Sequence, residues 1–112
     1  MSDLRKRMLA LSGNLARLVV TVPELGDVTV QELDGHARGA IETEMLRKEK
    51  SAWKLMLVAR SVIDPASGLP VFDDADLDSL GKLPARVLDP IFEAAFKLSG
   101  MGSDAIEGAK GN

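Results

Sequence analysis

The side chains with the greatest capacity for chemistry are four aspartates within six residues, Asp73, Asp74, Asp76 and Asp78. Acidic residues at alternate positions are typical of a calcium loop of the EF-hand type, which also needs glycine at its sixth position and glutamate at its twelfth. Counted from Asp74, these positions hold Ser79 and Ala85, so the pattern does not match. We predict instead that the cluster caps a short helix and complements its dipole, with docking of a basic partner as the alternative.

No catalytic constellation is apparent in the rest of the sequence. His36 is the single histidine, and no nucleophile or carboxylate is spaced to work with it, so we interpret it as a solvated or capping residue. The chain has no cysteine, no G-x-x-x-x-G-K-[ST] phosphate loop and no G-x-S-x-G elbow. We therefore predict that the protein is not an enzyme and works by binding other proteins, without a cofactor or a metal.

The composition is that of one small globular domain. The chain has 112 residues, of which 46% are apolar and 28% charged. The lack of cysteine excludes a disulfide framework and suits a cytoplasmic protein. The basic start of the chain reaches Gly13 and Asn14 without the apolar core of a signal peptide. No apolar run approaches the roughly 20 residues that cross a membrane, so we expect no membrane partner.

The net charge of −3 is unevenly distributed. Residues 1–60 carry ten Lys and Arg against eight Asp and Glu, whereas residues 61–112 carry four against nine. Neither half is basic enough to predict nucleic-acid binding, and the asymmetry favours head-to-tail self-association into a homo-oligomer. The basic group around Trp53 contains one aromatic residue only, so we interpret it as a solvated helix face: Arg47, Lys48, Lys50 and Lys54.

The first third of the chain predicts an N-terminal segment and a β-hairpin. Residues 1–16 form either a loose arm or a short helix with Leu4, Met8 and Leu11 on one side. Alternating branched residues predict a hairpin over residues 17–33, with its turn near Gly26. An isolated hairpin is marginal, so helices of the same chain or strands of another subunit must cover it.

The sequence after the hairpin predicts helices over about residues 35–48, 52–63, 74–80 and 84–98. Asp34 is the expected N-cap of the first and Ser51 of the second, and Pro90 should kink the last. We predict a mainly α fold with one β-hairpin, an α+β class, as a small single domain over residues 17–107. Residues 108–112 are expected to form a flexible tail.

The apolar content is high for so short a chain, and the helix over 52–63 has no evident polar side. Each apolar residue taken alone is more often part of a core, but we expect at least one patch to face a partner. Methionines adapt to varied surfaces, although they also fill gaps in cores. The candidate partner-binding residues are Trp53, Met56, Ile91, Phe92, Phe96, Met101 and Ile106.

Several short segments follow one another in a particular order across about residues 17–110. They are Val20-Thr21-Val22-Pro23-Glu24-Leu25-Gly26, Val28-Thr29-Val30-Gln31-Glu32-Leu33, Ala59-Arg60-Ser61-Val62-Ile63-Asp64, Gly68-Leu69-Pro70-Val71-Phe72, Leu77-Asp78-Ser79-Leu80-Gly81-Lys82-Leu83-Pro84, Leu88-Asp89-Pro90-Ile91-Phe92-Glu93-Ala94-Ala95 and Leu98-Ser99-Gly100-Met101. Their order resembles the tail assembly chaperones of long-tailed phages with non-contractile tails. Pro90 within the last helix departs from that pattern.

The resemblance implies a siphophage or prophage protein of viral morphogenesis, located in the cytoplasm of the bacterial host. Such a chaperone binds the tape-measure protein, keeps its long apolar helices soluble, helps recruit the tail-tube protein and is absent from the mature virion. Many members also occur in a frameshifted longer form, which would be a further partner. The alternatives are a structural head–tail connector or tail-terminator protein, and a small enzyme or nucleotide-binding protein that uses Asp74, Asp76 and Asp78.

Overall fold

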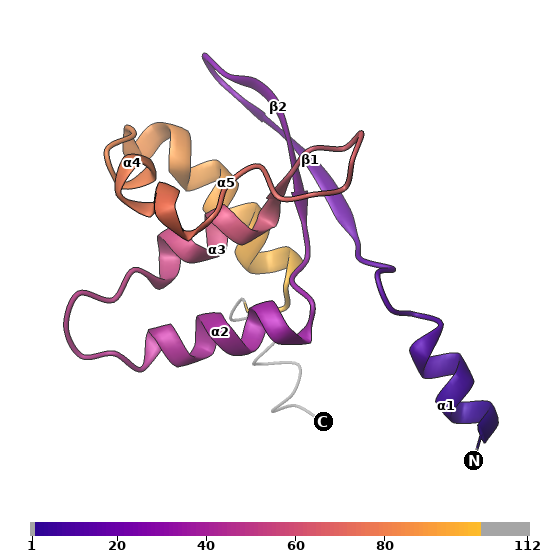
Figure 1. The fold of residues 1–112 in the computed structure, drawn as a ribbon. Helices are drawn as coiled ribbons and strands as arrows, with labels where there is room; N and C mark the ends of the chain where they lie inside the picture. The colour runs from indigo at the N-terminus through magenta and orange to yellow at the C-terminus, as the bar shows by residue number, and fades with distance from the viewer. Residues whose placement is uncertain (1, 102–112) are drawn as a thin grey trace, which may run out of the picture.

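The computed structural model describes residues 2–101. Helix α5 packs across strands β1 and β2, and α3 lies between α5 and α2 (Figure 1). The arrangement confirms the predicted α+β class of a small single-domain fold. In chain order the elements are α1 (Ser2–Leu9), β1 (Arg17–Val22), β2 (Gly26–Gln31), α2 (Gly35–Met45), α3 (Trp53–Ser61), β3 (Val62–Ile63), the 3₁₀ helix η1 (Asp74–Asp76), α4 (Leu77–Gly81) and α5 (Ala85–Leu98).

The hairpin of β1 and β2 forms where the alternation of branched residues predicts it. The two strands are antiparallel, with Arg17 opposite Gln31 and Val22 opposite Gly26, so residues 23–25 make the turn. Gly26 has φ of 92°, the left-handed conformation expected of it, which glycine adopts without a steric penalty. Alternate residues then face the core, where Val22 and Val30 are almost fully buried.

The predicted helix over 52–63 is wrong for its last two residues. Helix α3 ends at Ser61, and Val62 and Ile63 instead form strand β3, which pairs antiparallel with β2. Both residues are β-branched and fit a pleated sheet better than a helix, and the free edge of β2 offers them backbone partners. Pro70 of the returning loop then bridges to Ile63. The sheet therefore has three strands in the order β1-β2-β3.

The start of α2 is as predicted. The carboxylate of Asp34 accepts a hydrogen bond from the backbone N–H of Ala37 at 2.8 Å, and so satisfies one of the free donors of the first turn. The helix ends at Met45, three residues before the predicted boundary. His36 is exposed in its first turn, in agreement with a solvated residue.

The predicted capping role of Ser51 is wrong. The N-cap of α3 is Ala52, which makes no side-chain capping bond. The Ser51 hydroxyl donates instead to the carbonyl of Glu44 at 2.8 Å, and the Ala52 N–H reaches the Glu44 carboxylate at 3.2 Å. These bonds join the end of α2 to the start of α3, because the last carbonyls of a helix lack partners within it.

The acidic cluster caps η1, as the sequence predicts. The Asp73 carboxylate accepts from the N–H of Ala75 at 2.9 Å, and the Asp73 N–H donates to the carboxylate of Asp76 at 2.9 Å. This reciprocal pair is a capping box. Two further carboxylates form exposed ion pairs, Asp74 with Arg60 at 3.3 Å and Asp78 with Lys82 at 3.4 Å.

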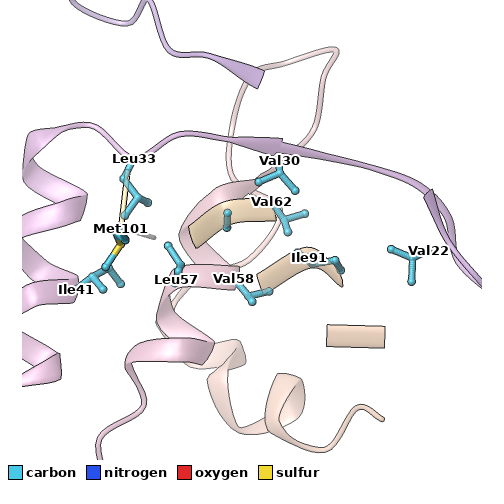
Figure 2. Packing of buried hydrophobic residues seen from close by; sticks show 10 residues of the cluster. Val22, Val30, Leu33, Ile41, Leu57, Val58, Val62, Ile91 and Met101 are labelled. Carbon is cyan, nitrogen blue, oxygen red and sulfur yellow. The ribbon is translucent and has the colours of Figure 1, made fainter. Parts of the chain in front are cut away.

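The hydrophobic core lies where α5 and α3 meet the sheet, and α2 covers its far end (Figure 2). Val30, Ile41, Leu57 and Ala95 have no exposed surface. Each fully buried aliphatic side chain of valine or leucine size contributes about 1.5–3 kcal/mol relative to an exposed one. These four residues come from β2, α2, α3 and α5, so the core joins the sheet to three helices.

Ser99 ties the end of α5 to the chain between β2 and α2. Its hydroxyl accepts a hydrogen bond from the backbone N–H of Leu33 at 3.0 Å, and its carbonyl accepts from the Arg38 guanidinium at 3.0 Å. Ser99 and Leu33 are both buried, so no water replaces the first of these bonds. The bond fixes where the chain leaves the sheet and enters α2.

We predict that Ser99→Ala lowers the free energy of unfolding by about 1–3 kcal/mol, because the buried N–H of Leu33 then has no acceptor. Chemical denaturation followed by circular dichroism measures the change. Ser12→Ala is the matched control, since it removes an exposed hydroxyl and should change stability by less than about 0.5 kcal/mol. Equal effects of the two substitutions would contradict the role of Ser99.

We predict that Pro90→Ala raises the free energy of unfolding by about 1–3 kcal/mol. Helix α5 continues across Pro90, which has no N–H to donate to the carbonyl of Arg86 four residues earlier. Alanine restores that donor and removes the ring. Pro84→Ala is the control, because Pro84 lies at the N-cap of α5, where no such bond is required. A loss of stability on Pro90→Ala would contradict the prediction.

Candidate functional site

An open apolar groove lies on the surface of the described residues. It lies between the β1–β2 hairpin, the loop after β3, α4 and the first half of α5, and it has a volume of about 730 Å³. Buried residues from three elements line its floor: Val58 of α3, Val62 of β3 and Ile91 of α5. The groove is thus an opening onto the core itself.

Four large apolar side chains on the groove are unusually exposed. The exposed fractions are 58% for Val19, 57% for Leu25, 53% for Val71 and 42% for Leu83. Apolar residues that lie together around a concavity mark a binding site more often than apolar residues scattered singly. We therefore take this groove, defined by its floor and by these four rim residues, as the candidate functional site.

Local backbone structure holds the rim residues in place. Val19 lies in β1 opposite Thr29 of β2. The N–H of Val71 donates to the carbonyl of Val62 at 3.1 Å, which fixes the returning loop against β3. Leu83 follows α4, and its N–H donates to the carbonyl of Leu80 at 3.1 Å. Backbone hydrogen bonds therefore hold these rim residues in place.

The charged side chains that line the groove are both acidic. Asp27 accepts a hydrogen bond from the Thr21 hydroxyl at 2.8 Å, and Asp64 accepts from the N–H of Ala66 at 2.9 Å. Both carboxylates are thereby held at the rim, and none of the Lys and Arg residues in the described part of the chain lines the groove. The site favours a ligand with an apolar face and positive charge beside it.

The predicted partner-binding residues separate into two sets. Trp53, Phe92 and Phe96 form an aromatic cluster between α3 and α5, with ring centroids 5.5–6.2 Å apart. The ammonium of Lys54 lies over Trp53 and Phe92 at 5.8 and 5.5 Å, a cation–π arrangement. All three rings are partly buried against the core.

The other predicted residues lie elsewhere. Met56 is partly buried against the core, and Ile91 and Met101 are core residues with exposed fractions of 5% and 8%. Ile106 and the tail 108–112 are outside the described residues. Ile91 lines the groove, whereas Trp53 and Phe96 do not.

Sequence reasoning did not find the four rim residues, because it looked for apolar stripes on helices. Two signals were present. Leu25 and Leu83 are large apolar residues beside predicted turns, where polar residues are usual. Val19 also lies out of phase with Val20 and Val22, which face the core. An apolar residue on the outer face of a strand or in a turn indicates a surface that a partner covers.

The arrangement offers binding rather than evident chemistry. Within residues 2–101, no group of three or more His, Asp or Glu side chains is placed to hold a metal ion. In the same range, no helix is long and apolar enough to span a membrane. What the groove can do is accept the apolar face of a helix, a recurring mode of peptide recognition.

The fold and the groove define a small α+β protein with an open apolar groove beside its core. No family model and no curated protein matches the sequence. Among solved structures, the chain is similar to the tail assembly chaperone of bacteriophage HK97. The TM-score is 0.61 over 88% of this chain and 98% of that one, at 18% sequence identity. The likeness confirms the fold that the resemblance in the sequence implies.

We predict that a neutral apolar dye such as Nile red binds in the groove and fluoresces more strongly there. The double variant Leu25→Asp/Val71→Asp (the groove variant) should lose most of this signal because two charges then enter the apolar rim. Leu46→Asp/Leu69→Asp is the matched control: its residues are 82% and 65% exposed and do not line the groove. Equal loss in both double variants would contradict binding at this site.

Proposed function

We propose that this protein is a phage tail assembly chaperone. The observation that carries the proposal is the likeness of its fold to the HK97 tail assembly chaperone, which extends over nearly the whole of both chains. The ordered sequence segments that resemble this group of proteins support the same role independently of the coordinates. The exposed apolar groove supports it physically, because a chaperone needs a surface that can hold apolar segments of a client.

We propose the tape-measure protein as the client, and an amphipathic helix of it as the segment that is bound. A helix places apolar side chains at positions i, i+4 and i+7 on one face, and a groove with an apolar floor can receive that face. The acidic rim formed by Asp27 and Asp64 would select helices with basic residues beside the apolar stripe.

The groove is a better candidate for the client contact than the aromatic cluster. Leu25 and Val71 are more than half exposed, whereas Trp53, Phe92 and Phe96 are partly buried against the core of their own chain. Covering exposed apolar surface lowers the free energy of the complex by about 25 cal/mol per Å² removed from water, and half-buried rings have less such surface left to remove.

The remaining parts of the proposal follow from the role. The chaperone acts in the cytoplasm of the bacterial host, helps bring the tail-tube protein to the tape-measure protein, works together with a frameshifted longer form of itself, and leaves before the virion is complete. Each requires contacts with tail proteins of the phage, and none requires a cofactor or catalysis.

We predict that co-expression with this chain keeps the tape-measure protein in the soluble fraction and that the two proteins co-purify. The groove variant should leave most of the tape-measure protein insoluble, because the complex would no longer bury the Leu25 and Val71 side chains and would have to desolvate two carboxylates in their place. Quantitative gel analysis of the soluble and pelleted fractions measures the effect.

The control is Leu46→Asp/Leu69→Asp, which should protect the client as well as the unchanged chain does. Tape-measure protein that is equally insoluble with and without the unchanged chain would overturn the proposed client. Stable presence of the chain in purified virions would instead favour a head–tail connector or tail-terminator protein.

A further inference from the structure

Helix α1 carries a set of apolar side chains that the rest of the described chain does not cover. Leu4, Met8 and Leu11 follow one another at intervals of four and three residues, so they lie along one side of the helix and its final turn. Their exposed fractions are 55%, 63% and 62%. Every residue described from Asp3 to Asn14 is exposed, and α1 stands apart from the rest of the fold (Figure 1).

Helix α1 joins the hairpin at the end opposite the turn that contains Leu25 of the groove rim (Figure 1). The N–H of Leu11 donates to the carbonyl of Met8, and the N–H of Asn14 donates to the carbonyl of Leu11. Ala16 is held by two bonds to Glu32, one to its carboxylate at 2.8 Å and one to its backbone N–H at 2.9 Å. Residues 10–15 connect the end of α1 to this fixed point.

The groove and α1 match in apolar character and are complementary in charge. The groove is apolar with the two acidic residues Asp27 and Asp64 at its rim. Helix α1 is apolar on one side and carries Arg5, Lys6 and Arg7 against the single acid Asp3. Since Asp3 pairs with Arg7 at 3.2 Å, the charges of Arg5 and Lys6 are available to an acidic partner.

We infer that α1 of a second copy of this chain occupies the groove when no client is present. Leu4, Met8 and Leu11 enter the groove as anchors, Arg5 lies beside them at its acidic rim, and Lys6 adds positive charge from the outer side of the helix. The statement that a client displaces α1 rests on the proposed function, because a tape-measure helix would have to occupy the same groove. Self-association through α1 does not depend on the client and stands by itself.

The contact joins two different surfaces of the chain, so it is heterologous. Each copy offers one α1 and one groove, and the groove of one copy can be filled while its α1 fills another. Such a contact continues from copy to copy and gives assemblies that grow with concentration. A variant that lacks one of the two surfaces can bind at one end of such an assembly but cannot extend it.

The experiment measures the molecular mass of the full chain by sedimentation velocity over a range of concentrations. We expect the unchanged chain to self-associate, and the α1 variant Leu4→Asp/Met8→Asp and the groove variant each to remain monomeric. The dissociation constant should rise by about tenfold or more in each, equivalent to a loss of about 1.4 kcal/mol. Leu46→Asp/Leu69→Asp is the matched control and should associate like the unchanged chain.

Mixing the two variants gives the sharpest test. The α1 variant keeps its groove and the groove variant keeps its α1, so an equimolar mixture should form a 1:1 dimer and nothing larger. Arg5→Glu/Lys6→Glu is a second α1 variant that leaves all the apolar residues in place; its association should be weaker, and added salt should strengthen it because salt screens the new repulsion. Circular dichroism establishes that each variant is folded.

Several results would overturn the inference: a monomeric unchanged chain at all concentrations, an α1 variant that associates like the unchanged chain, or a mixture of variants that stays monomeric. Adding the tape-measure protein separates this inference from the proposed function. Loss of self-association on client binding supports both. Self-association through α1 with no client binding at all would leave the inference standing and overturn the proposed client.

Discussion

The burial of one face of α5 between the hairpin and α3 is the interaction on which the rest of the structure depends. Val22 and Val30 of the hairpin meet Ile91 and Ala95 of α5, and Leu57 of α3 closes the same core. Without α5 the hairpin would be a marginal structure with one apolar face in water. The hydrogen bond between the Leu33 N–H and the Ser99 hydroxyl then fixes the start of α2 relative to this core.

The groove is bounded by the hairpin on one side and by the first half of α5 on another. At the turn end of the hairpin, the short helix α4 and the loop after β3 stand beside the core and leave part of it open. The opening leaves the apolar side chains of Val19 and Leu25 in water, and covering them would stabilise the protein.

The sequence predicted most elements because their signals are local. Alternation of branched residues located the hairpin, and the carboxylates of Asp34 and Asp73 located two helix starts. Strand β3 was missed because Val62 and Ile63 continue an apolar run, and only the edge of β2, far away in the sequence, makes them a strand. The groove was missed for the same reason: it is formed by segments that meet only in space.

The order of the elements along the chain has a consequence for synthesis on the ribosome. The hairpin is made early, directly after α1, but the helix that covers its apolar face is the last element of the described part. Translation proceeds at about 5–20 residues per second, so the roughly 70 residues between β2 and the end of α5 take several seconds. Until α5 is made, Val22 and Val30 lack the helix that covers them, and the nascent chain is open to capture by chaperones of the cell or by neighbouring nascent chains on a polysome.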